Sequence, residues 1–152
     1  MNNPMKVLVI DDNAYFLHYQ QLLLEQMGIE VVTSIHADET IKLIKLFDPD
    51  LLIMDKLVDI DGFVIMDQVK KEFDYLPVLI FSGQDLGCDK KRAFASGCID
   101  YLQKDMDTAE FLKLIKRYCH FGHITKSCAH MSKTIDDSIE TLTKSLKRRE
   151  NE

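Results

Sequence analysis

The sequence predicts an α/β fold in which a parallel sheet is covered by helices on both faces. Short apolar segments of strand length alternate with segments of helical periodicity, and three of the apolar segments contain no polar residue. Strands that are buried on both faces have this composition. The alternation itself indicates βαβ units with right-handed crossovers. Five such units fill roughly the first 120 residues.

Each predicted element has its own signal in the sequence. The expected strands are 7–10, 30–33, 51–54, 78–81 and 99–102. The expected helices are about 14–27, 37–47, 63–73 and 89–96, with a fifth that starts near 107–108. Gly28 and Gly97 end the first and fourth helices, and Pro77 closes the turn after the third. The predicted sheet therefore has five strands, each followed by a helix.

The composition narrows the class of protein. The chain has 152 residues, of which 46% are hydrophobic and 29% charged, which is typical of a globular domain. A net charge of −6 argues against broad binding to nucleic acid or membrane surfaces. No apolar run is long enough for a bilayer span, and the N-terminus lacks the layout of a signal peptide. We therefore expect a cytoplasmic protein whose four cysteines are free thiols.

Polar residues follow the predicted strands at the positions where those strands end. They are Asp11, Asp12, Asp55, Ser82 and Lys104. Ligand sites of open α/β sheets lie at the carboxyl ends of the strands, so these side chains are expected to converge. Close carboxylates favour a hard cation such as Mg²⁺ or Mn²⁺, and a hydroxyl and an ammonium suit phosphoryl oxygens. An aspartate after a strand is also common turn chemistry, so the prediction depends on the whole set.

The order and spacing of five motifs resemble a known family. The motifs are residues 7–13, 49–55, 61–63, 77–83 and 97–104. Together they are similar to the response-regulator receiver domain of two-component signalling, and the resemblance covers about residues 6–119. It implies a doubly wound, flavodoxin-like or CheY-like five-stranded sheet of order 2-1-3-4-5, followed here by an additional C-terminal amphipathic helix.

The resemblance also implies a role for each strand-end residue. Asp55 would be the phosphoacceptor, and it would share a Mg²⁺ or Mn²⁺ ion with Asp12, with Asp11 directly or through water, and with the backbone carbonyl of Leu57. Ser82 and Lys104 would each bind a phosphoryl oxygen. Ser82 and the aromatic ring of Tyr101 would form the switch that changes the surface of the fourth helix, fifth strand and fifth helix.

The implied function is a phosphorelay response regulator, which would be a phosphoprotein and a signalling domain. It would receive the phosphoryl group from a histidine kinase or a histidine phosphotransfer protein and act through a downstream protein target. Self-phosphorylation from small donors and autodephosphorylation would be its only catalytic activities. The alternative is a degenerate receiver that serves as a phosphorylation-independent interaction or dimerisation module.

Two departures from the family pattern bear on this choice. The loop from Asp55 to Asp61 lacks the usual proline and is one residue short. Lys104 is followed by Asp105, where the family typically has a proline after a cis bond. Because a cis bond to a non-proline residue costs about 2.5–4 kcal/mol, we expect a trans bond and a somewhat relocated Lys104.

The residues after about Cys119 form a separate extension, which divides the chain into a receiver domain (1–120) and a C-terminal helical extension (121–152). We expect Gly122 to break the fifth helix. Apolar residues then recur at spacings of three or four along one helical face: Ile124, Cys128, Met131, Ile135, Ile139, Leu142 and Leu146. The stripe would fold back on its own domain, dock on a partner or, as we favour, form a homodimer. DNA binding by this chain is not expected.

Two further hypotheses concern the start of this extension. Five residues of zinc-ligand type lie close in sequence: Cys119, His120, His123, Cys128 and His130. Their spacing matches no strong zinc motif. His130 lies in a segment that faintly resembles a phosphorylatable histidine helix, but Thr134 stands where a glycine is usual. Neither hypothesis is preferred over the amphipathic helix.

Overall fold

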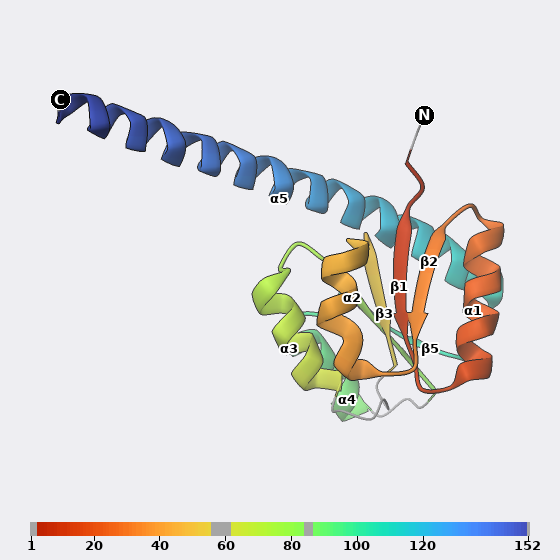
Figure 1. The fold of residues 1–152 in the computed structure, drawn as a ribbon. Helices are drawn as coiled ribbons and strands as arrows, with labels where there is room; N and C mark the ends of the chain where they lie inside the picture. The colour runs from red at the N-terminus through yellow and green to blue at the C-terminus, as the bar shows by residue number, and fades with distance from the viewer. Residues whose placement is uncertain (1–2, 56–61, 84–86, 152) are drawn as a thin grey trace.

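The computed structural model describes residues 3–55, 62–83 and 87–151 (Figure 1). Five strands form one parallel sheet with the order β2-β1-β3-β4-β5, which confirms the predicted fold class. The strands are β1 (Lys6–Ile10), β2 (Glu30–Ser34), β3 (Leu51–Met54), β4 (Val78–Ser82) and β5 (Asp100–Gln103). Each predicted strand agrees with the structure to within one residue at either end.

The helices also lie close to their predicted positions. They are α1 (Ala14–Gln26), the 3₁₀ turn η1 (Ala37–Glu39), α2 (Thr40–Phe47), α3 (Gly62–Glu72), α4 (Gly87–Ala95) and α5 (Thr108–Glu150). The first helix begins where the Asn13 side chain accepts a hydrogen bond from the Phe16 N–H. Asp107 caps α5 in the same way, by accepting from the Glu110 N–H. No helix in the described part of the chain combines the length and apolarity that a membrane span requires.

Alternate residues of the strands build two separate hydrophobic cores. Leu8 and Met54 belong to the core that α2, α3 and α4 cover. Val9 and Ile53 belong to the other core, which is covered by α1 and the first part of α5. Figure 1 shows these helices on the two sides of the sheet. Because side chains alternate along a strand, a strand that is apolar throughout fills both cores at once.

The last helix departs from the prediction, because Gly122 does not break it. A single helix of 43 residues runs from Thr108 to Glu150, a length of about 65 Å. Its first part packs on the sheet, and its second part projects away from the domain (Figure 1). A glycine inside a helix costs only about 1 kcal/mol relative to alanine. That cost is offset here, because Gly122 is buried against the backbone of Asp50.

Candidate functional site

Three aspartates meet at the carboxyl ends of β1 and β3. Asp11 and Asp12 follow β1, and Asp55 follows β3, where its N–H donates to the Ile10 carbonyl at 2.9 Å. One carboxylate oxygen from each residue lies within 4.8 Å of the others. Asp11 and Asp55 are buried, whereas Asp12 is exposed. The sheet register therefore brings together the carboxylates that the sequence predicted.

Asp11 is the most enclosed of the three carboxylates. The Asn13 N–H donates to Asp11 Oδ1 at 2.9 Å, which aims the other oxygen into the site. Burial raises the pKa of Asp11 to about 6, and the neighbouring charge of Asp55 acts in the same direction. The hydrogen bonds from Lys104 and Asn13 oppose this rise. Asp11 is thus a carboxylate that a nearby cation would strongly stabilise in its ionised form.

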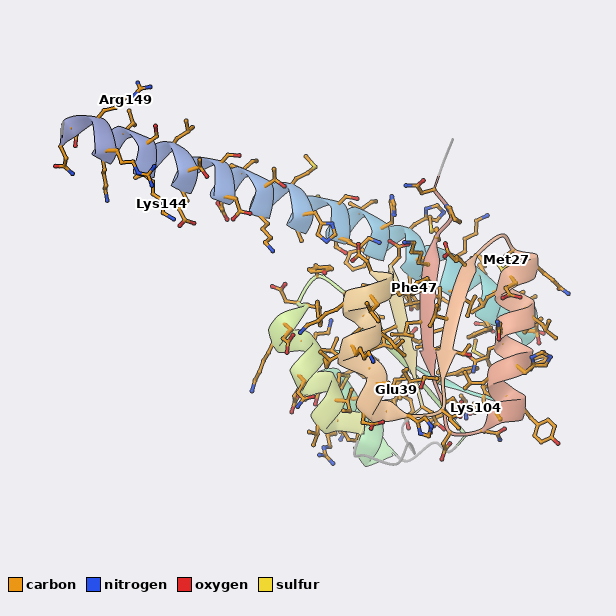
Figure 2. All side chains as sticks on the ribbon, in the orientation of Figure 1. Met27, Glu39, Phe47, Lys104, Lys144 and Arg149 are labelled. Atoms are coloured by element: carbon orange, nitrogen blue, oxygen red, sulfur yellow. The ribbon has the colours of Figure 1, made fainter. Side chains whose placement is uncertain are left out.

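Lys104 bridges two of the aspartates. Its Nζ lies 2.8 Å from Asp11 Oδ2 and 3.2 Å from Asp55 Oδ2. The ammonium also lies 4.5 Å from the centre of the Phe16 ring. Figure 2 shows Lys104 at one end of the sheet and Phe47 at the other. No cis peptide bond occurs among the described residues, so the predicted trans bond before Asp105 is confirmed, and Lys104 still reaches the carboxylates.

Ser82 lies on β4, which pairs with β3, and Tyr101 lies on β5, which pairs with β4. Ser82 is the last residue of β4 and is fully buried, and its carbonyl accepts a hydrogen bond from the Lys104 N–H at 2.8 Å. Tyr101 is buried in the core that α4 covers. The predicted carbonyl ligand, Leu57, lies outside the described residues, as does the shortened loop 56–61.

The charges and ligand types of this site fit a divalent cation. Three carboxylates gather at this site, one ammonium contacts two of them, and the pKa of one buried carboxylate, Asp11, is raised. Carboxylate oxygens are the ligands that Mg²⁺ and Mn²⁺ prefer in proteins. Within the described residues, this is the only group of three or more carboxylate, histidine or cysteine ligands that is close enough to share an ion. Among the same described residues, the zinc-type side chains around Cys119 do not form such a group.

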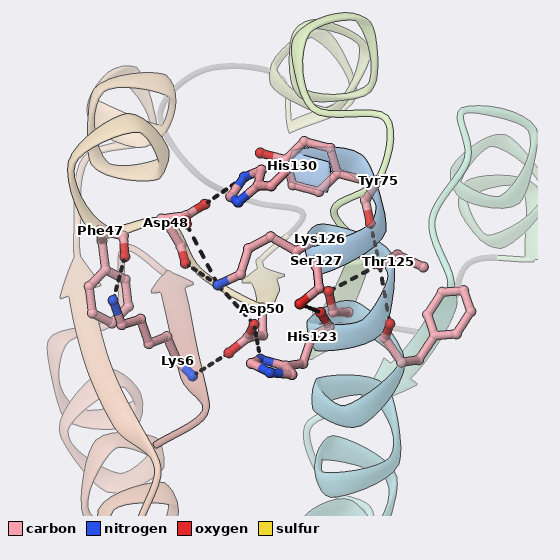
Figure 3. A network of polar contacts seen from close by, with 12 residues as sticks. Lys6, Phe47, Asp48, Asp50, Tyr75, His123, Thr125, Lys126, Ser127 and His130 are labelled. Atoms are coloured by element: carbon pink, nitrogen blue, oxygen red, sulfur yellow. Dashed lines mark hydrogen bonds and ion pairs between the residues drawn. The ribbon is translucent and has the colours of Figure 1, made fainter. Parts of the chain in front are cut away.

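A second polar cluster lies near the opposite ends of the strands, and the sequence did not predict it (Figure 3). Asp50 is buried, and its carboxylate accepts from the Lys6 N–H at 2.8 Å and from Lys126 Nζ at 2.9 Å. His123 Nδ1 lies 3.2 Å from the same carboxylate. Lys126 also donates to the Asp48 carbonyl at 2.7 Å. Because the partners are more than 40 residues apart, no local pattern could have revealed the cluster.

This cluster attaches the middle of α5 to the receiver part. His130 Nε2 lies 3.8 Å from Asp48 Oδ1, and its ring packs edge-on against Tyr75. The Thr125 hydroxyl donates to the Tyr75 carbonyl at 2.8 Å. Two of the three histidines in the zinc hypothesis, His123 and His130, therefore face aspartates just before β3 (Figure 3). His18 and His36 are exposed.

Comparisons with known proteins agree with this geometry. A family model described as the response regulator receiver domain matches residues 7–116. The heme response regulator HssR of Staphylococcus haemolyticus is 29% identical over 150 residues, a match that covers 91% of this chain and 66% of that protein. HssR of Staphylococcus aureus is 26% identical with the same coverage. The chain thus spans just under two thirds of the length of these relatives.

Solved structures show the same fold. A response regulator structure from Chloroflexus aurantiacus is 28% identical, with a TM-score of 0.72, and the match covers 78% of this chain and 99% of that one. A signal receiver domain from Pseudomonas fluorescens has a TM-score of 0.77 at 18% identity, and the match covers 84% and 95% of the two chains. The second match is a likeness of fold alone.

Proposed function

Because the chain belongs to the response regulator receiver domain family, we propose that Asp55 accepts a phosphoryl group from a histidine kinase or a histidine phosphotransfer protein. The observation that carries this proposal is the contact of Lys104 with both Asp11 and Asp55 at the carboxyl ends of the strands. That arrangement places a nucleophilic carboxylate, a cation-binding pair and a phosphate-binding ammonium within one site.

The side chains divide the transfer between them. A carboxylate oxygen of Asp55 attacks phosphorus, and the bond from phosphorus to the donor's nitrogen or oxygen breaks with its electron pair leaving on the donor. Lys104 moves its contact from Asp55 to an oxygen of the new phosphoryl group. The Ser82 hydroxyl donates to another oxygen. Asp11, Asp12 and Asp55, with the carbonyl of Leu57, would hold Mg²⁺ or Mn²⁺, which when bound offsets negative charge on the transferring group.

The output of the domain is proposed to be a protein contact. Ser82 and Tyr101 lie on adjacent strands and both are buried. Movement of Ser82 toward the phosphoryl group would change the space into which the Tyr101 ring can turn. The surface of α4, β5 and α5 then presents a different shape to a downstream protein. We propose a cytoplasmic location, no nucleic-acid contact by this chain, and no catalysis beyond self-phosphorylation and autodephosphorylation.

The two parts of the chain are proposed to have separate tasks. Residues 1–120 form the receiver domain, and residues 121–152 form an extension whose exposed stripe mediates self-association. The stripe does not fold back on its own domain, because Met131, Ile135 and Leu142 are all more than half exposed. Self-association through this helix brings two receivers into one assembly.

The test is phosphorylation by acetyl phosphate in the presence of Mg²⁺, followed by intact mass measurement. The wild-type chain gains one phosphoryl group, and Asp55→Asn gains none. Asp48→Asn is the matched control, because Asp48 lies on the same segment but away from the three aspartates, and it should behave as wild type. If the wild-type chain stays unmodified at saturating Mg²⁺, the degenerate receiver becomes the better description.

A further inference from the structure

The projecting part of α5 carries an apolar stripe with a regular repeat. From Ile124 to Leu146 the apolar residues follow spacings of four, three and four, and then the same spacings again. The stripe therefore repeats every eleven residues, which corresponds to about 3.67 residues per turn. A stripe of this repeat drifts slowly around a straight helix, in the sense opposite to that of a heptad stripe, and it favours a slight right-handed winding of paired helices.

The attachment to the receiver part fixes the direction in which this stripe faces. Gly122, Lys126 and His130 contact the receiver part and lie on one side of α5. Ile124, at 63% exposed, begins the stripe on the other side. Figure 1 shows the helix continuing beyond the domain as an isolated rod. A partner helix can therefore approach the stripe without meeting the receiver part.

The stripe is uniformly exposed, and small hydroxyl residues lie along part of its margin. Met131, Ile135, Ile139, Leu142 and Leu146 are each 57–64% exposed. The positions that flank them on the helical wheel include Ser132, Ser138 and Thr143. Small hydroxyl side chains allow close approach of a second helix. Most helical stability in proteins comes from packing of an apolar face, so burial of the stripe would stabilise the projecting helix.

The charges along the extension favour a second copy of this chain as the partner of the stripe, and they favour an antiparallel orientation of the two helices. The first half of the projecting helix carries Asp136, Asp137 and Glu140, whereas its last turns carry Lys144 and the basic run 147–149. Parallel pairing of two copies would place acid beside acid and base beside base. Antiparallel pairing places each acidic half beside a basic half, so the sequence is complementary to itself in that orientation.

We propose that two copies of this chain pair through residues 131–150 as an antiparallel helix dimer, an inference that rests on the proposed self-association. Asp136 and Lys147 are one repeat apart, so they lie on the same side of the stripe. A twofold axis between residues 141 and 142 then sets Asp136 opposite Lys147 of the partner subunit. It also sets Ser138 opposite Ser145 of the partner subunit. The receivers lie at opposite ends of the paired helices.

Sedimentation of the full chain over a concentration series tests the dimer. The wild type should dimerise reversibly, and the double substitution Ile139→Asp with Leu142→Asp should leave a monomer. The matched control is Thr141→Asp with Lys133→Asp, which places two acids on the face away from the stripe and should reduce association far less. A wild type that is monomeric throughout overturns the proposal and assigns the stripe to a different protein partner.

Disulfide trapping tests the orientation in a background of Cys88→Ser and Cys128→Ser. When Ser138→Cys chains and Ser145→Cys chains are mixed and oxidised, the antiparallel dimer gives mainly the mixed disulfide. A parallel dimer gives self-linked pairs of each chain, which would overturn the orientation. Asp55 phosphorylation is measured on the same samples, so failure of the dimer and failure of the phosphoacceptor role are seen separately.

Charge reversal provides an independent check of register. Asp136→Lys alone and Lys147→Asp alone should each weaken dimerisation several-fold, because each places like charges opposite one another. Both changes in one chain should restore the affinity toward that of the wild type. A double variant that is weaker than either single variant would overturn the proposed register.

Discussion

Gly122 lies directly against the backbone carbonyl of Asp50. A Cβ at position 122 would come within 1.7 Å of that oxygen and within 2.9 Å of Pro77 Cγ. The glycine therefore allows α5 to cross close beneath the start of β3, where Lys126 and His123 reach the Asp50 carboxylate (Figure 3). This contact fixes where the helix leaves the domain.

The contact predicts that Gly122→Ala destabilises the protein. Helix propensity alone would make this change stabilising by about 1 kcal/mol. The clash with the Asp50 backbone should outweigh that gain and lower the free energy of unfolding by about 2 kcal/mol. Urea denaturation followed by circular dichroism measures the difference. Ser132→Ala, on the exposed part of the same helix, is the control and should change stability by less than about 0.5 kcal/mol. A more stable Gly122→Ala variant would contradict the described packing.

Lys126→Met should also destabilise the chain. The methionine keeps most of the side-chain volume but removes the positive charge from the buried Asp50 carboxylate. We expect a loss of about 2 kcal/mol in the free energy of unfolding, because a buried carboxylate loses its closest cation. Lys133→Met, at an exposed position of α5, should be nearly neutral under the same denaturation conditions. Equal effects of the two substitutions would mean that the contact between Lys126 and Asp50 contributes nothing to the free energy of unfolding.

The cluster around Asp50 also illustrates what the sequence could not predict. Apolar runs and glycines located all five strands and most helix ends, because those signals are local. The pairing of Asp50 with Lys126 is a contact between distant segments, and nothing near either residue indicates it. The same limit explains the wrong prediction at Gly122, where a local helix-breaking tendency was outweighed by a tertiary contact.

Stabilisation by Mg²⁺ should depend on pH through Asp11. Its pKa is raised from 3.8 to about 6, so the folded chain holds this proton more tightly than the unfolded chain. Without metal, the contribution of Asp11 to stability is full below about pH 4 and is lost as the pH rises through about 6. Bound Mg²⁺ requires the ionised form, so its stabilising effect has the opposite dependence on pH.

The thermal midpoint Tm measures this effect. Saturating Mg²⁺ should raise Tm clearly at about pH 7.5 and much less at about pH 5, below the pKa of Asp11. In Asp11→Asn, the rise at the higher pH should be reduced. An equal rise at both pH values in the wild type would show that protonation of Asp11 does not compete with the cation.

The cysteines should differ in their reactivity. Burial raises the pKa of Cys98 to about 11 and that of Cys119 to about 12, so both thiols stay protonated and enclosed at neutral pH. Cys128 is exposed on α5. Brief treatment with iodoacetamide and peptide mapping should show modification of Cys128 but not of Cys98 or Cys119. Both buried thiols should react once urea unfolds the chain, and their rapid modification in the native chain would contradict the packing of α5.

The candidate site was predictable because its residues follow strands that the apolar pattern locates. Asp11, Asp55 and Lys104 each stand just beyond a strand, and parallel pairing brings those ends together. The distances from Lys104 to the carboxylates could not be predicted in the same way. The Lys104 contacts depend on its backbone being held by Ser82 and on the path of the chain through Asp105.

Chemical mapping of the acyl phosphate tests directly whether Asp55 is the phosphoacceptor. After reaction with acetyl phosphate and Mg²⁺, borohydride reduces a phosphorylated aspartate to homoserine. Tryptic cleavage gives the peptide 46–56, which holds Asp48, Asp50 and Asp55, so fragmentation can tell them apart. We expect homoserine at position 55 alone, and none when Mg²⁺ is omitted. Homoserine at position 48 or 50, or none in the whole chain, would contradict this assignment.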